Sequence, residues 1–145
     1  MMNDILCYLD HFPIVPNYLI KEARQVLIDN KNIFHQPDYK NYKIFEAPIN
    51  LKNFVNEFLP NHYVFVHSIN EHLLIHRDYK RKTAYNYIID SGGLDVETCF
   101  YDNNCNLISK FKIDKCRWHR LDVSILHNVV NLTNNRIAIT ANLPL

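Results

Sequence analysis

The triplet His76-Arg77-Asp78 has residue types that serve two different chemistries. An Asp in this context can accept the proton of a substrate hydroxyl during phosphoryl transfer. A His and an Asp two positions apart on a β-strand can instead hold one metal ion, because alternate side chains of a strand point to the same face. Other features of the chain separate these two interpretations.

Phosphoryl transfer of the protein-kinase type requires a glycine-rich loop over the phosphates. The 145-residue chain has only two glycines, Gly92 and Gly93, which stand side by side, and it is too short for two lobes. A kinase also needs a metal-binding Asn five residues after the Asp, and that position is Thr83. These three features exclude the kinase interpretation and favour the metal.

A metal site needs a third ligand, and the best candidate is His127, at the end of the run "LDVSILH". Two imidazoles and one carboxylate form the facial triad of non-haem Fe(II) sites, which leaves three positions for a chelating co-substrate and O₂. Arg136 follows nine residues later, at the start of the last predicted strand, so it should return to the same cavity. Its guanidinium suits the far carboxylate of a dicarboxylic 2-oxoacid.

Helices are predicted before the strands that carry these residues. Apolar residues recur at helical spacing in "PNYLIKEARQVLIDN" and "NLKNFVNEFLP", with Asn17 and Asn50 as expected caps. Residues 1–60 are therefore expected to be a mainly helical support region, with loop over 31–49 apart from a short strand at "YKIFEA".

From residue 62 the pattern changes to short runs rich in β-branched and aromatic residues. The predicted strands are 62–69, 72–78, 83–90, 96–102, 107–113, 121–127 and 136–143. Turn segments such as "SGGLD", "DKCRWHR" and "NLTNN" separate them. One domain over residues 1–145 is expected, built as a sandwich or barrel and not as a parallel α/β sheet.

The run "IHRDYKR…YNYII…ETCFYD", followed by "RLDVSILHNVVNLTNNRIAITANL", resembles the 2-oxoglutarate/Fe(II)-dependent dioxygenases. The resemblance covers residues 62–145 and implies a double-stranded β-helix, an eight-stranded, cupin-like jelly-roll. The part from Asp122 to Arg136 is also similar to the aspartyl/asparaginyl β-hydroxylase branch and to small phage-encoded relatives. That branch lacks the carboxylate ligand, whereas Asp78 is present here, and its presence also argues against a halogenase.

The resemblance implies an oxidoreductase in which His76, Asp78 and His127 hold Fe(II) and Arg136 binds 2-oxoglutarate. O₂ would be consumed, succinate and CO₂ released, and the substrate hydroxylated or demethylated. Asn86 is expected to face the co-substrate, because similar phage proteins carry an Asn at this place.

Three further residues are candidates around the same cavity, of which strand parity supports only Thr140. Thr140 shares the strand face of Arg136 and is expected to add a hydroxyl to the carboxylate site. Thr98 and Tyr101 are candidates for the wall of the pocket. The histidines at 11, 35, 62, 67, 72 and 119 have no convergent spacing and are interpreted as non-ligands.

The composition of the chain limits the classes of partner that are expected. The net charge of +1 gives no global field for nucleic acid, and nucleic acid is not supported beyond the local basic cluster 77–82. That cluster is expected to be a solvated loop in which Arg81 supports the site through an acidic partner, or else a contact for an anionic substrate. No run is long enough to span a membrane, and the N-terminus does not resemble a secretory signal.

Four cysteines without C-x-x-C spacing predict reduced, mostly buried thiols and a cytoplasmic location, and the residue usage hints at a bacterial or phage genome. The substrate is not predicted and could be a small molecule or a macromolecule. Two alternatives to the oxygenase stay open: a non-catalytic cupin-like metal-binding module, and a structural jelly-roll protein.

Overall fold

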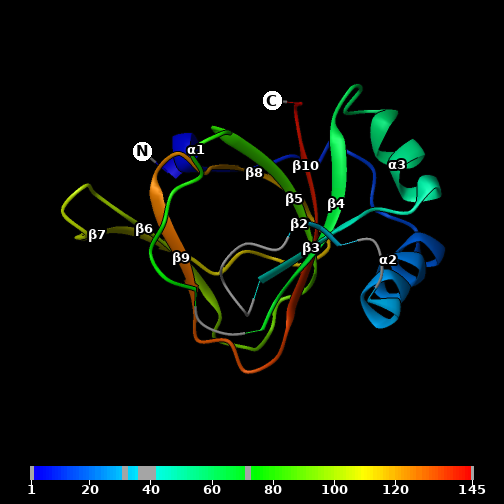
Figure 1. Ribbon diagram of the computed structural model, residues 1–145. Coiled ribbons are helices and arrows are strands. Elements are labelled where there is room, and N and C mark those ends of the chain that lie inside the picture. Colours follow the sequence, from blue (N-terminus) through cyan, green and yellow to red (C-terminus); the bar gives the residue numbers. More distant parts are fainter. Residues whose placement is uncertain (1, 31–32, 36–41, 71–72, 145) are drawn as a thin grey trace.

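Two antiparallel sheets face each other in the computed structural model, which describes residues 2–30, 33–35, 42–70 and 73–144 (Figure 1). Among these residues the large sheet has seven strands, in the spatial order β1 (Leu6–Tyr8), β8 (Trp118–Asp122), β5 (Thr83–Asp90), β10 (Arg136–Asn142), β4 (Tyr63–Ile69), β3 (Tyr42–Glu46) and β2 (Ile33–His35). The small sheet contains β7 (Leu107–Phe111), β6 (Glu97–Tyr101) and β9 (Leu126–Val130).

The chain crosses repeatedly from one sheet to the other. After β5 in the large sheet it forms β6 and β7 in the small sheet, returns for β8, crosses again for β9 and ends in β10. All the paired strands are antiparallel. This alternation makes a jelly-roll, and the predicted fold class, mainly β with N-terminal helices, is confirmed.

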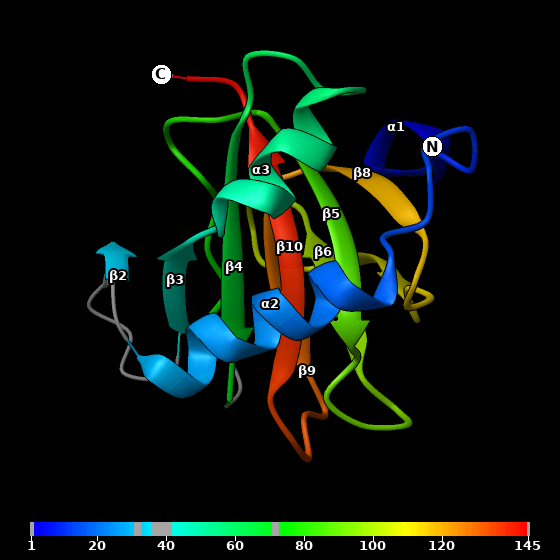
Figure 2. The same ribbon diagram turned by 90° about the vertical axis from the view of Figure 1, so that its right-hand side faces the viewer.

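Three helices are described: α1 (Met2–Ile5), α2 (Asn17–Asp29) and α3 (Ile49–Asn56). Both α2 and α3 lie on the outer face of the large sheet, over β4, β10 and β5 (Figure 2). Their predicted apolar stripes are confirmed, because Leu19 of α2 and Leu51 of α3 are fully buried. No described helix has the length and apolar character needed to cross a membrane.

The predicted caps of α2 and α3 are wrong. Pro16 and Pro48 occupy the cap positions in extended conformation, and neither helix has a side-chain cap. The Pro16 carbonyl accepts the first helical hydrogen bonds, so Asn17 already lies within the helix. Asn50 lies in the first turn of α3, where its amide donates to Glu22 of α2.

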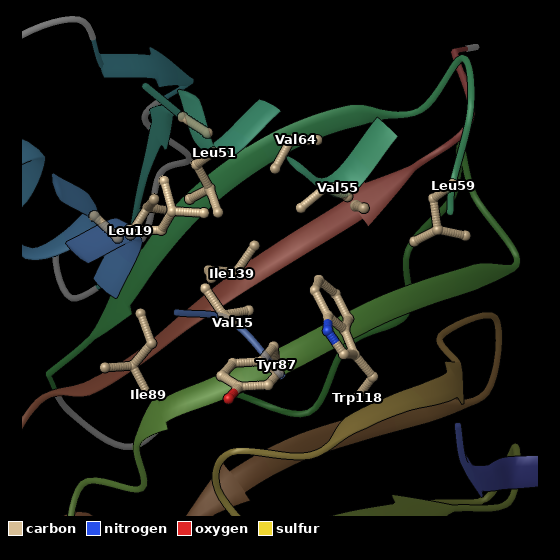
Figure 3. Packing of buried hydrophobic residues seen from close by; sticks show 14 residues of the cluster. Val15, Leu19, Leu51, Val55, Leu59, Val64, Tyr87, Ile89, Trp118 and Ile139 are labelled. Atoms are coloured by element: carbon tan, nitrogen blue, oxygen red, sulfur yellow. The ribbon is translucent and has the colours of Figure 1, made fainter. Parts of the chain in front are cut away.

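The largest apolar cluster fills the space between the two longer helices and the large sheet (Figure 3). Alternate residues of β4, β5 and β10 point into it, among them Val66, Tyr87 and Ile139. Trp118 joins from β8, and its indole N–H donates to the carbonyl of Pro13 at 3.0 Å. The outer face of the large sheet therefore packs against α2 and α3.

The other residues of the same strands face the small sheet. A second apolar cluster lies there and includes Ala84, Phe100, Leu121 and Ala138. Buried polar side chains accompany it on this inner face, which distinguishes it from the outer face. The inner face is where the candidate site lies.

Two predicted strands are wrong in position. Of 72–78, residues 73–78 form no strand and pair only through an isolated bridge at His76, while residue 72 lies outside the described residues. The run 121–127 contains a turn, because the Asp122 carboxylate accepts hydrogen bonds from the backbone and hydroxyl of Ser124. β8 ends before this turn, and β9 begins after it.

The first 60 residues contain strands as well as helices. β1 pairs with β8, and β3 pairs with β4, so both add to the large sheet. The short strand expected at "YKIFEA" is confirmed as β3. The loop expected before it is wrong at residues 33–35, which form β2, and its residues 31–32 and 36–41 lie outside the described residues. The four cysteines form no disulfide with one another, but only Cys99 is buried, whereas Cys105 and Cys116 are exposed, so the expectation of mostly buried thiols is wrong.

Candidate metal centre

His76 and Asp78 lie on the segment between β4 and β5, beside the beginning of β9. The backbones of His76 and His127 donate to each other's carbonyl groups, with N···O distances of 3.0 and 2.7 Å. The backbone N–H of Asp78 donates to Val123 at 2.9 Å. The segment is thus fixed against the β8–β9 turn without being a regular strand.

This pairing brings the three predicted ligands together. The Nε2 atoms of His76 and His127 lie 3.9 and 3.8 Å from Oδ1 of Asp78. All three possible ligand atoms lie within 4.8 Å of one another, and no other such group occurs among the described residues. Ligand atoms on one octahedral metal ion are roughly 3 Å apart, so small side-chain movements would close the site.

Backbone carbonyls orient both imidazoles. Nδ1 of His76 lies 2.8 Å from the carbonyl oxygen of Leu74, and Nδ1 of His127 lies 2.6 Å from that of Ile125. A carbonyl can only accept, so Nδ1 carries the proton and Nε2 presents its lone pair to the site. Burial lowers the pKa of His127, which favours the neutral ring that a metal requires.

Arg81 contacts the carboxylate ligand. Its Nε donates to Oδ2 of Asp78 at 2.5 Å, and both side chains are about four-fifths buried. Nη1 of the same guanidinium reaches Oδ1 of Asn142 at 3.3 Å and Oγ1 of Thr140 at 3.5 Å, both on β10. The expected acidic partner of Arg81 is therefore Asp78 itself.

Arg136 opens β10, as predicted, and is 5% exposed. Its guanidinium donates to Oγ1 of Thr98 at 3.0 Å and to the carbonyl of Ser91 at 3.3 Å. Among the described residues no carboxylate pairs with it. Burial lowers the pKa of Arg136 to about 10, so the group stays charged at neutral pH. A buried cation with neutral partners can bind an anion.

One cavity of about 600 Å³ joins these groups. His76, Asp78, His127 and Arg136 all line it, as does Asn86. Asn86 is 9% exposed, and among the described residues its Oδ1 atom has no hydrogen-bond partner.

The three further candidates, Thr140, Thr98 and Tyr101, have different surroundings. Thr140 is buried on the face of Arg136, but it does not line the cavity, and its hydroxyl contacts Arg81. Thr98 lines the cavity and accepts from Arg136. Tyr101 does not line the cavity, and its hydroxyl donates to Asn128 at 2.9 Å.

Three further cavity residues were not identified from the sequence: Tyr42, His67 and His119. The Tyr42 hydroxyl lies 3.2 Å from Nδ1 of His67. Burial lowers the pKa of His67 to about 3 and that of His119 to about 4, so both rings are neutral at physiological pH. Neither histidine belongs to the ligand group. Each of these histidines follows an outward-facing residue, Val66 or Trp118. Alternation along the strand could therefore have indicated that both histidines face inward.

No family model matches the sequence, and no curated protein matches it either. Solved structures do match. A prolyl hydroxylase from Trichoplax adhaerens, in complex with a hypoxia-inducible-factor peptide fragment, has a TM-score of 0.66 and 13% identity, over 97% of this chain and 84% of that chain. A Pseudomonas putida prolyl-4-hydroxylase has a TM-score of 0.62 and 11% identity, over 95% and 91%. At these identities the likeness shows the shared jelly-roll fold.

Proposed function

We propose that the protein is an Fe(II)- and 2-oxoglutarate-dependent oxygenase that hydroxylates or demethylates an unidentified substrate. One observation carries the proposal: a cluster of two histidines and a carboxylate shares its cavity with a buried arginine that has no carboxylate partner among the described residues. The jelly-roll shared with two prolyl hydroxylases supports it at the level of the fold.

The donor set fits Fe(II). Two neutral imidazoles and one carboxylate leave half of an octahedron open, whereas a structural zinc site is closed by four protein ligands. His76 and His127 already present Nε2 because their Nδ1 atoms face carbonyl oxygens. Each ring is therefore already turned so that Nε2 is directed to the place where a metal would bind.

Bound iron and 2-oxoglutarate would supply the oxidising chemistry, with O₂ consumed and succinate and CO₂ released. In the proposed site, the guanidinium of Arg136 pairs with the far carboxylate of 2-oxoglutarate. Asn86 is the second polar group assigned to the co-substrate, because it lines the cavity and the Oδ1 atom of its buried amide lacks a hydrogen-bond partner among the described residues. Thr140 lies on the same face of β10, but its hydroxyl contacts Arg81 outside the cavity lining, so it is not assigned to the co-substrate.

Apolar side chains enclose these polar groups. Ile69, Ile88 and Val129 line the same cavity as the proposed metal ligands and Arg136. They exclude water from the region where the co-substrate would lie, so the pairing of Arg136 with a carboxylate is strengthened by the low local dielectric. The buried His67 and His119 add no positive charge there.

The test is succinate formation from 2-oxoglutarate with Fe(II) and O₂, together with 2-oxoglutarate binding in the presence of Mn(II) under anaerobic conditions. The wild-type protein should bind 2-oxoglutarate and form succinate slowly without substrate. His76→Ala should lose metal binding, and Arg136→Met should keep the metal but bind 2-oxoglutarate about 30-fold more weakly or worse, as expected when a buried charge pair is lost.

Arg117→Met is the matched control, because this arginine is paired with Asp10 and Asp114 away from the cavity. It should behave like the wild type. Metal binding without 2-oxoglutarate binding would favour the non-catalytic metal-binding module. Absence of both would favour the structural jelly-roll.

A further inference from the structure

We propose that Arg81 is a positioning residue that confines the metal to a single oxygen of Asp78. This inference rests on the metal site of the proposed function and is independent of 2-oxoglutarate. The two carboxylate oxygens have different surroundings. Oδ1 faces the Nε2 atoms of His76 and His127 at 3.9 and 3.8 Å, whereas Oδ2 accepts from Nε of Arg81 at 2.5 Å.

The same guanidinium holds the ligand segment from a second side. The backbone of the segment is attached to the β8–β9 turn and to β9, through the Val123 and His127 contacts. Arg81 adds a link to β10, because its Nη1 reaches Asn142 at 3.3 Å and Thr140 at 3.5 Å. The Asp78 carboxylate is thus fixed between both sheets.

Only arginine can make this link. Its planar guanidinium directs several N–H groups in fixed directions, so it can donate to Asp78 and to β10 together. A lysine ammonium could pair with Oδ2, but it is a point charge on a flexible chain and would not fix the orientation of the carboxylate.

Single-oxygen binding has a chemical consequence. With one atom from each ligand, the protein occupies three positions of an octahedron. A carboxylate that bound through both oxygens would take a fourth position and leave two. A chelating 2-oxoacid and O₂ together need three. By occupying Oδ2, Arg81 keeps the third position open.

The rest of the basic cluster does not share this role. Arg77 points elsewhere, and its Nη2 donates to Asn103 at 2.8 Å. Lys80 and Lys82 are exposed. Arg81 is the one described member of the cluster whose side chain contacts a proposed ligand.

The experiment measures Co(II) binding by calorimetry and the visible absorption of bound Co(II), which responds to the number and geometry of its ligands. The proteins are the wild type, Arg81→Met, Arg81→Lys and the control Arg77→Met. The control removes the same charge from the same segment without touching Asp78. No 2-oxoglutarate is added.

Arg81→Met should bind Co(II) 10- to 100-fold more weakly than Arg77→Met, the usual range for loss of a partner behind a ligand, and its spectrum should change. Arg81→Lys should bind with intermediate affinity, and it decides the outcome if Arg81→Met does not fold. Equal affinities and unchanged spectra in both Arg81 variants would overturn the positioning role. A wild type that binds no Co(II) would instead overturn the metal site itself.

Discussion

Two backbone carbonyls orient the proposed histidine ligands before any metal is considered. In both cases the carbonyl belongs to the residue two positions earlier, Leu74 for His76 and Ile125 for His127. The orientation of each ring is therefore a local property of its own segment. Metal binding would not have to reorient the rings, which lowers the entropic cost of binding.

The buried charge of Arg136 makes a stability measurement informative. A guanidinium that is 5% exposed and has only neutral partners destabilises the fold through its lost hydration. Arg136→Met keeps much of the volume and removes the charge. We expect its free energy of unfolding, measured in urea, to be unchanged or higher by about 1–3 kcal/mol.

The same variant should lose 2-oxoglutarate binding, so stability and binding should change independently. Thr98→Val serves as a control, because it removes the hydroxyl that accepts from Arg136 and leaves the charge. A loss of more than about 2 kcal/mol in Arg136→Met would mean that the arginine has a structural role.

At the residue scale, the sequence could predict the groups that are distinctive as a set. His76, Asp78, His127 and Arg136 have types and spacings that point to one chemistry, and all four line one cavity. His67 and His119 could not be assigned in the same way. Their positions depend on strand parity, and parity can be used only when the ends of each strand are known.

At the scale of elements, the turn after β5 is hydrogen-bonded to the residues that lead into β10. The carbonyl of Gly92 accepts from the backbones of Thr133 and Asn134 at 2.8 and 2.9 Å, and the adjacent Ser91 carbonyl accepts from Arg136. Gly92 has a φ of 86°, a conformation that favours glycine. The "SGGLD" and "NLTNN" segments are therefore one packed unit that fixes Arg136.

Gly92→Ala should disturb this unit. An added Cβ would lie 2.6 Å from Cδ2 of Leu132 and 3.1 Å from the backbone nitrogen of Arg136, in a backbone conformation that alanine disfavours. We expect the free energy of unfolding to fall by about 2–3 kcal/mol in urea titrations. Ser91→Ala should change it by less than about 0.5 kcal/mol, because Ser91 contacts Arg136 through its backbone. Equal effects of the two changes would refute this explanation.

The strands themselves were predictable where alternation was clear, as in β4, β5 and β10. The start of β8 was not predicted, because the segment "DKCRWHR" is mostly polar and was interpreted as a turn. Its inward His119 lies on the cavity side and its outward Arg120 is exposed, so neither gives an apolar signal. The hydrogen bonds that the Asp122 carboxylate accepts from Ser124 form a turn. The run 121–127, predicted as one strand, therefore belongs to two strands, β8 and β9.

At the scale of the whole molecule, two buried neutral histidines couple stability to pH. The pKa of His119 is lowered to about 4 by burial, against about 6.5 in an unfolded chain. Between these values the unfolded state binds one more proton than the folded state. Stability is therefore fully present above pH 6.5 and decreases as the pH falls towards 4.

For His119 alone this decrease is about 1.4 kcal/mol per pH unit, or about 3 kcal/mol across the window. His67 contributes in the same direction, with its pKa lowered to about 3. The measurement is urea unfolding of the wild type and His119→Phe at several pH values between 4.5 and 7. The variant should show the shallower slope, and parallel curves would contradict the assignment.

The largest apolar cluster lies on the outer face of the large sheet, under α2 and α3, and contains none of the proposed metal or co-substrate residues. This cluster is thus separated from the cavity by the thickness of one strand layer. Substitutions at the polar residues of the cavity therefore leave this cluster intact, whereas the apolar cavity residues Leu121 and Ala138 belong to the second cluster. The polar groups of the cavity can thus be exchanged while the packing between the helices and the large sheet is kept, which makes the fold a tolerant scaffold for changes in what the cavity binds.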